Sequence, residues 1–206
     1  SAKHGESLAE AGSGAGAALL CATHRLPTCH FTGFERDAAA ITLAGQGIAT
    51  NAFAARADIR THDIAERPSA LENVYDQSFS NPPFFDPAAI RAPAPGKTNA
   101  FLADTPLKAW ILFLHHITKP GGRITLIHRA ATLADLLELL NPRAGEIEVL
   151  PIRPAPAAPA NRVLIRARKG LRRGPVTLYD GIALHDVAGG HFSSRAAACF
   201  DGGALE

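Results

Sequence analysis

Residues 80–85 have the sequence Ser-Asn-Pro-Pro-Phe-Phe and directly follow a predicted β-strand. Pro82 and Pro83 fix their own φ angles and have no N–H group, so the turn is stiff and its carbonyl oxygens face outward. Together with the Asn81 side chain, these oxygens could bind a planar amine, and Phe84 could stack on its face. The alternative is a plain proline turn that ends a strand.

A glycine-rich turn follows the strand that is predicted at residues 7–11. Gly12, Gly14 and Gly16 allow a ligand to approach the backbone closely, and the helix predicted from Ala17 onward offers unpaired N–H groups at its start. On its own, a turn of this kind is a weak indication of a site for a nucleotide-like ligand.

Glu35 ends a second predicted strand, at residues 30–34, and lies a little over twenty residues beyond the glycine turn. At this spacing an acidic side chain can bind both hydroxyls of a ribose. Alternatively, Glu35 complements the positive N-terminal end of the next predicted helix, at residues 37–53. The sequence leaves both roles open.

Strands and helices alternate through the first 80 residues, which predicts a parallel α/β sheet. A third strand is expected at residues 57–62 and ends at Asp63, and a fourth is expected at residues 74–79, before Asn81. Ligands of such sheets bind beyond the carboxyl ends of the strands. We therefore expect the glycine turn, Glu35, Asp63 and Asn81 to lie at one edge of the sheet.

The rest of the chain continues the alternation of helices and strands. Residues 86–104 are rich in Pro, Ala and Gly and predict a mobile loop beside the site. The remaining elements are predicted in this order: a helix at residues 107–117, a turn at 119–122, a strand at 123–128, a helix at 133–140, strands at 146–152 and 161–168, and a tail or small hairpin at 175–206.

A basic cluster begins in the last of these strands and includes Arg166, Arg168, Lys169 and Arg172. These side chains could contact the phosphates of a nucleic acid. Alternatively, they form a solvated edge that discourages aggregation.

Composition restricts the class of protein. The 206 residues are 47% hydrophobic and 19% charged, which fits one folded domain over residues 1–206. The net charge of +2 and the pI of about 8.6 permit an anionic partner without requiring one. No apolar stretch is long enough to span a membrane, and no signal segment opens the chain. The three cysteines lack the spacing of a metal site and favour a reduced, cytoplasmic setting without a metal.

Taken together, these features resemble class I S-adenosylmethionine-dependent methyltransferases. Residues 10–16, Glu-Ala-Gly-Ser-Gly-Ala-Gly, resemble the acidic-x-Gly-x-Gly-x-Gly cofactor loop of that family, and residues 80–84 resemble the Asn-Pro-Pro-aromatic signature of its amino-group methyltransferases. Residues 119–129 and 166–170 are similar to segments of the bacterial valine-tRNA adenine-N6 methyltransferases. The resemblance covers nearly the whole chain, but we expect the family's N-terminal segment to be absent, and Phe84 stands where Tyr is commoner.

The resemblance implies a Rossmann-like α/β fold, with a mostly parallel seven-stranded sheet, one antiparallel strand near the C-terminus and helices on both faces. It implies S-adenosylmethionine as the cofactor, tRNA as the partner and N6 of an adenine as the methyl acceptor. The residues implied to bind the cofactor are Glu10, Gly12, Ser13, Gly14, Gly16, Glu35, Arg36, Asp63, Ile64 and Asn81. Those implied for catalysis are Asn81, Pro82 and Phe84, and those for the substrate are Pro83, Phe85, Arg166, Arg168, Lys169 and Arg172.

Two other functions fit the same residues. The amine-binding turn also suits the side-chain amide of a glutamine, so the substrate could be a protein such as a release factor. The chain could also be a noncatalytic module that binds the cofactor or RNA. The sequence does not distinguish a monomer from a homodimer, and it indicates no membrane partner.

Overall fold

The computed structural model describes residues 2–83, 105–187 and 189–203. The chain divides into two compact units, Ser1–Gly122 and Arg123–Glu206. The loop that we expect at residues 86–104 lies outside the described residues.

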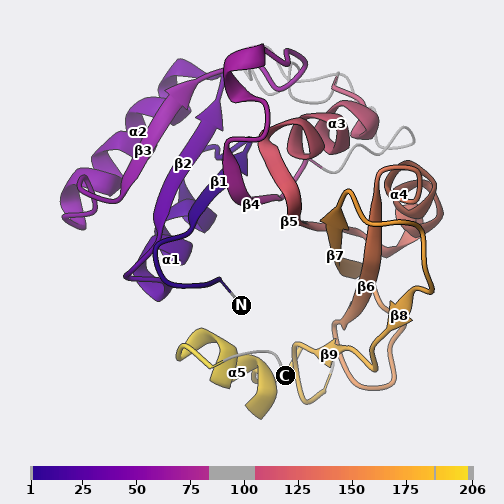
Figure 1. Cartoon of the computed structure of the whole chain (residues 1–206). Coiled ribbons are helices and arrows are strands. Elements are labelled where there is room, and N and C mark those ends of the chain that lie inside the picture. The colour runs from indigo at the N-terminus through magenta and orange to yellow at the C-terminus, as the bar shows by residue number, and fades with distance from the viewer. Residues whose placement is uncertain (1, 84–104, 188, 204–206) are drawn as a thin grey trace, which may run out of the picture. The chain divides into compact units, whose positions relative to one another are not determined.

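The first unit alternates strands and helices, as the sequence predicts (Figure 1). Its elements are β1 (Ser7–Ala11), α1 (Ala17–Arg25), β2 (His30–Glu35), α2 (Ala38–Thr50), β3 (Ala57–Thr61), η1 (Ser69–Leu71), β4 (Tyr75–Ser80) and α3 (Leu107–Ile117). The strand order is β3-β2-β1-β4, and neighbouring strands pair in parallel. This confirms the parallel α/β sheet that the alternation predicts.

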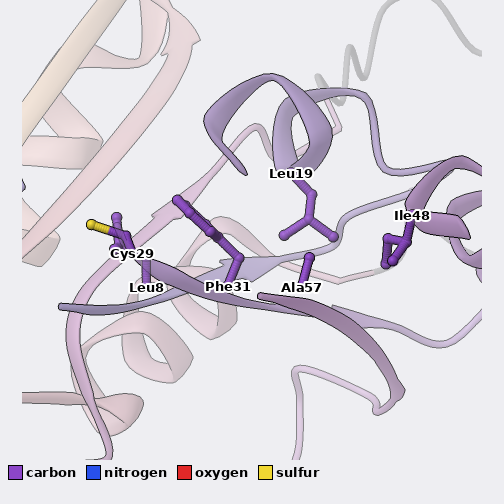
Figure 2. Packing of buried hydrophobic residues seen from close by; sticks show 6 residues of the cluster. All are labelled: Leu8, Leu19, Cys29, Phe31, Ile48 and Ala57. Carbon is purple, nitrogen blue, oxygen red and sulfur yellow. The ribbon is translucent and has the colours of Figure 1, made fainter. Parts of the chain in front are cut away.

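One face of this sheet is covered by α1 and α2. Leu19 of α1 and Ile48 of α2 pack over Leu8, Phe31 and Ala57, which come from β1, β2 and β3 (Figure 2). All five are at most 6% exposed. Full burial of a large aliphatic or aromatic side chain contributes about 1.5–3 kcal/mol. This packing fixes α1 against the sheet and therefore fixes the glycine turn that precedes it.

The opposite face of the sheet is covered by α3. Phe34 points away from Phe31 because successive side chains of a strand alternate between faces. The Phe34 ring meets Phe113 of α3 edge to face, with 5.5 Å between the ring centroids. Trp110 and Ile111 of the same helix are at most 3% exposed. The helices of the first unit thus lie on both faces of its sheet.

The second unit contains most of β5 (Thr118–Arg129), which begins in the first unit. The elements after it are η4 (Ala130–Thr132), α4 (Leu133–Leu140), β6 (Ala144–Arg153), β7 (Arg162–Lys169), β8 (Thr177–Leu178), β9 (Ile182–Ala183) and α5 (Ser194–Phe200). The strand order is β5-β7-β6-β8, and β9 also pairs with β6. β7 is antiparallel to both of its neighbours, whereas β8 and β9 run parallel to β6. The antiparallel strand near the C-terminus is therefore present, and the fold is Rossmann-like, as the sequence predicts.

Two sequence predictions differ from the structure in this half of the chain. The turn predicted at residues 119–122 is wrong, because these residues lie within β5. Gly121 has a left-handed φ of 76°, which bends a strand locally without reversing it. The expected tail or hairpin at residues 175–206 instead contains β8, β9 and α5. The described residues thus form nine strands rather than seven. None of their helices combines the length and apolarity needed to cross a bilayer.

Candidate functional site

The parallel register of the first unit brings the four predicted polar features to one edge of the sheet. Ala11 at the end of β1 is level with Phe34 on one side and with Ser80 on the other. Glu35 is level with Thr61 at the end of β3, so Asp63 follows at the same edge. The expectation that the glycine turn, Glu35, Asp63 and Asn81 share an edge is therefore confirmed.

Asn81 lies directly beyond this edge. The buried Ser80 hydroxyl donates a hydrogen bond to the Ala11 carbonyl oxygen at 2.8 Å, so the end of β4 is fixed beside the start of the glycine turn. Asn81 itself is exposed, Pro82 is buried and Pro83 is half-buried. The Asn81 side chain is therefore available to a ligand, on a backbone that Pro82 anchors.

The glycine turn is tied to β2 by its own amides. The N–H groups of Gly12 and Ser13 both donate to the Phe34 carbonyl oxygen, at 2.8 and 3.0 Å. Gly12 and Gly14 have left-handed φ angles of 67° and 52°. A Cβ atom on Gly12 would overlap the Trp110 ring, so only glycine fits under that side chain. A Cβ atom on Gly14, by contrast, would have no other atom within 4 Å.

Glu35 is 3% exposed and accepts three backbone hydrogen bonds. Its Oε2 accepts from Gly14 N–H at 2.8 Å, and its Oε1 accepts from the N–H groups of Arg36 and Asp37 at 2.8 and 3.0 Å. The carboxylate thus joins the glycine turn to the residues that precede α2. Asp37 is the N-cap of α2, so two of these hydrogen bonds come from N–H groups at the start of that helix. Glu35 therefore also has the second role that the sequence left open, beside the N-terminal end of a helix.

The carboxyl group of Glu10 has a pKa far from its ordinary value. Burial raises the pKa of Glu10 to about 8, although hydrogen bonds with the Ser13 side chain and the Leu19 backbone oppose the shift. Its side chain is 2% exposed, and among the described residues its Oε2 has no hydrogen-bond partner. A buried oxygen without a partner is costly in the folded protein. It is therefore a natural contact point for a polar group of a ligand.

A small cavity lies where these elements meet. Glu35, Arg36, Asp63 and Ile64 line it, together with Trp110. Arg36 Nη1 is 3.3 Å from Asp63 Oδ2, and a hydrogen bond from Ala65 N–H is the main cause that lowers the pKa of Asp63. The cavity holds only about 10 Å³, which is space for one water molecule. This volume is smaller than a ring-sized ligand needs.

Trp110 is one of the wall residues that sequence reasoning missed, with Phe34, His62 and Thr105. Its spacing in the predicted helix indicates a buried position, but nothing in the sequence indicates that the ring covers Gly12. Conversely, Phe84 and Phe85, which the resemblance implies for stacking and for the substrate, lie outside the described residues.

The basic residues implied to contact the substrate lie in the second unit. Arg166 Nε is 2.5 Å from Glu148 Oε2, and Arg168 Nη1 is 3.2 Å from Glu146 Oε2. The hydrogen bond from Arg166 is the main cause that lowers the pKa of Glu148. Lys169 is only 9% exposed. Of the four implied residues, Arg172 is the one that is fully exposed and outside the strand.

Comparisons with known proteins agree with this fold. Residues 1–98, slightly less than half of the chain, match the family model of the methyltransferase small domain. A solved structure of Atu636 from Agrobacterium tumefaciens, described as a predicted O-methyltransferase, is 25% identical over 96% of this chain and 89% of that chain, with a TM-score of 0.77. No curated protein matches the sequence.

Two further solved structures share the fold at lower identity. Protein 1320 of Thermoplasma acidophilum is 21% identical over 81% of this chain and 80% of its own, with a TM-score of 0.55. TrmN from Thermus thermophilus is 17% identical over 82% of this chain and 45% of its own, with a TM-score of 0.58. Together, the matches and the strand order support a class I methyltransferase with S-adenosylmethionine as its methyl donor.

Proposed function

We propose that this chain transfers a methyl group from S-adenosylmethionine to an exocyclic amino group, and that the acceptor is N6 of an adenine in tRNA. One observation carries the proposal. The Asn81-Pro82-Pro83 turn directly follows Ser80, and Ser80 is hydrogen-bonded to Ala11, the last residue of β1 before the glycine turn. A group that could bind an amine is thus adjacent to a loop of the kind that binds this cofactor.

The residues of the first unit fit this cofactor in their chemistry. The glycine turn lets a ligand approach the backbone, Glu35 offers a carboxylate for ribose hydroxyls, and Asp63 with Ile64 offers a polar and an apolar contact for adenine. The unpartnered Oε2 of Glu10 would gain a partner. Because the cavity holds about one water molecule, we infer that the Arg36–Asp63 pair or Trp110 moves on binding.

The cofactor supplies a methyl group that is already activated on a sulfonium ion, so the protein mainly orients the acceptor. An adenine amino group is a poor nucleophile because its lone pair is delocalised into the ring. Asn81 Oδ1 and the Pro82 carbonyl oxygen are two acceptors that could bind both N–H groups of that amine. This would favour a more tetrahedral nitrogen with its lone pair directed at the methyl group. No strong general base is required.

A glutamine side-chain amide is the second candidate acceptor. It presents the same planar N–H groups to Asn81 and Pro82. The observation in its favour is that Arg166 and Arg168 are already paired with glutamates, which weakens the argument for phosphate contacts. A protein substrate needs no such contacts.

The test uses the full chain with labelled S-adenosylmethionine and either total tRNA or a release factor. Mass spectrometry of the tRNA nucleosides should reveal N6-methyladenosine. Asn81→Ala should lower the rate of transfer more than tenfold, which corresponds to about 1.4 kcal/mol or more, and leave cofactor affinity within about twofold. The exposed Asn51 caps the C-terminus of α2, and Asn51→Ala should leave both quantities unchanged.

Other outcomes would support a different acceptor or a different function. Transfer to the release factor alone would favour the glutamine amide. Retention of more than about a tenth of the rate by Asn81→Ala would contradict the role of the turn. Calorimetry without detectable binding of S-adenosylmethionine would favour a noncatalytic module.

A further inference from the structure

The second unit contains a larger cavity, of about 290 Å³, that the methyl-transfer proposal does not use. Its floor consists of Leu150 of β6 and Leu164 of β7, and its walls include Arg166, Tyr179 and Arg195. Pockets for small molecules occupy about 300–1,000 Å³, so this one has room for a single small ligand. All of its lining residues belong to the second unit.

The charged groups in the wall are held in fixed positions. Glu148 accepts hydrogen bonds from Arg166 Nε at 2.5 Å and from the Tyr179 hydroxyl at 2.8 Å. The hydrogen bond with Glu148 is the main cause that raises the pKa of both Arg166 and Tyr179. The guanidinium group and the phenol ring are thus positioned before any ligand arrives, which lowers the entropy that these side chains lose on binding.

The C-terminal segment supplies the remaining wall. Arg195 Nη1 donates to the Gly181 carbonyl oxygen at 2.9 Å. The Ser193 hydroxyl donates to the Ala183 carbonyl oxygen at 2.6 Å, which anchors the start of α5 to β9. Because β8 and β9 both pair with β6, this segment is fixed along the strand that forms the floor (Figure 1). The cavity is therefore built by strand pairing and not by a loose tail.

The chemistry of the lining defines its ligand. Glu148 is paired with Arg166 within the lining, so the net charge of +1 comes from Arg195 and favours an anion beside it. A guanidinium group matches the geometry of phosphate oxygens. The Tyr179 side chain is 45% exposed and offers a face to a flat ring, and the leucine floor suits an apolar body. The ligand should combine one phosphate with one flat ring.

We propose that this cavity binds a nucleoside 5′-monophosphate, in which a phosphate monoester and a flat base are joined through a ribose. The source of that group is either a free nucleotide or the 5′-terminal nucleotide of an RNA chain, because the internal phosphates of RNA are diesters. The binding does not depend on methyl transfer, so it can be tested whether or not the proposed function holds.

The test measures binding of uridine 5′-monophosphate to the full chain in the presence of saturating S-adenosylhomocysteine, which blocks the candidate cofactor site. Calorimetry gives the affinity, and the Nε–H resonances of Arg166 and Arg195 in NMR spectra give the location. Uridine, which lacks the phosphate, should bind at least tenfold more weakly. Displacement of the nucleotide by single-stranded RNA that carries a 5′-phosphate would identify RNA as the source, and binding without displacement would identify the free nucleotide.

Variants separate a ligand site from a purely structural cluster. Arg195→Gln should weaken binding at least tenfold, whereas Arg195→Lys, which keeps the charge but loses the guanidinium geometry, should weaken it less than Arg195→Gln does. Arg162→Gln in β7 lies outside the lining and should leave the affinity within twofold. Equal affinity for uridine and its monophosphate would overturn the proposal. So would unchanged binding by folded Arg195→Gln, or the absence of any shift at the two arginine resonances.

Discussion

The buried carboxyl group of Glu10 should make the stability of the folded protein depend on pH. Its pKa is about 8 in the folded protein and near 4.5 when exposed, so between these values the folded chain holds a proton that the unfolded chain releases. Stability should therefore fall as the pH rises from about 4.5 to 8. Each pKa unit corresponds to about 1.4 kcal/mol, so the loss amounts to several kcal/mol. Denaturant unfolding at pH 5, 7 and 9 measures it.

Glu10→Gln removes the titration and keeps the shape of the side chain. We expect this variant to be more stable than the wild-type protein at pH 9 and to have a flatter dependence on pH. Glu66 is exposed, and Glu66→Gln should leave the pH dependence unchanged. A wild-type slope that persists in Glu10→Gln would show that another group causes it.

The two glycines of the turn should respond differently to the same substitution. Gly12→Ala places a methyl group against the Trp110 ring, and overpacking of this kind costs about 1–3 kcal/mol in addition to the backbone strain. Gly14→Ala meets no atom within 4 Å and incurs only the strain of a left-handed φ, about 1–2 kcal/mol. Urea unfolding of both variants measures the difference. Equal losses would mean that Trp110 does not cover Gly12.

At the level of elements, the sequence predicts the first unit well because its signals are local. Short apolar segments between turn-forming residues mark β1 to β4, and Asp37 marks the start of α2. In a parallel sheet the carboxyl ends of the strands share an edge, so the location of the candidate site follows from the order of elements alone. The sequence could not predict how small the cavity is. Its size depends on the Trp110 ring, which packs over Gly12, a residue far away in the sequence.

The second unit is less predictable because its signals are not local. β8 and β9 have two residues each, which is too short for any alternation, and they exist only because β6 offers them a free edge. The glycines at 121 and 122 suggest a turn, but the pairing of β5 with β7 continues the strand. Tertiary pairing overrides local preference in both cases.

The N-cap of α2 is a local signal that can be tested directly. The Asp37 side chain accepts a hydrogen bond from Ala40 N–H at 2.8 Å. Asp37→Ala should lower the free energy of unfolding by about 1 kcal/mol, whereas Asp37→Asn should cost much less because asparagine also caps helices. Asp186, which is exposed and lies outside any helix, is the matched control for Asp37→Ala. Thermal unfolding of the three variants measures these effects.

For the whole molecule, charge limits how it can bind RNA. The net charge is only +2, and Arg166 and Arg168 are paired with Glu148 and Glu146. Each phosphate neutralised on single-stranded RNA adds about −0.7 to the slope of log affinity against log salt. If tRNA is the substrate, recognition must therefore depend more on shape and on the bound base than on a broad phosphate contact.

We accordingly expect a shallow salt dependence, with a slope of about −1 to −3 for tRNA binding between 50 and 200 mM salt. Arg172 is exposed, so Arg172→Gln should make the slope shallower by about the amount that one phosphate contact contributes. Arg168→Gln should change it less, because Arg168 is already paired with Glu146 and is therefore less available to a phosphate. Filter binding across the salt range measures these slopes. A wild-type slope steeper than about −6 would contradict this expectation, because it requires more phosphate contacts than the basic cluster at residues 166–173 supplies.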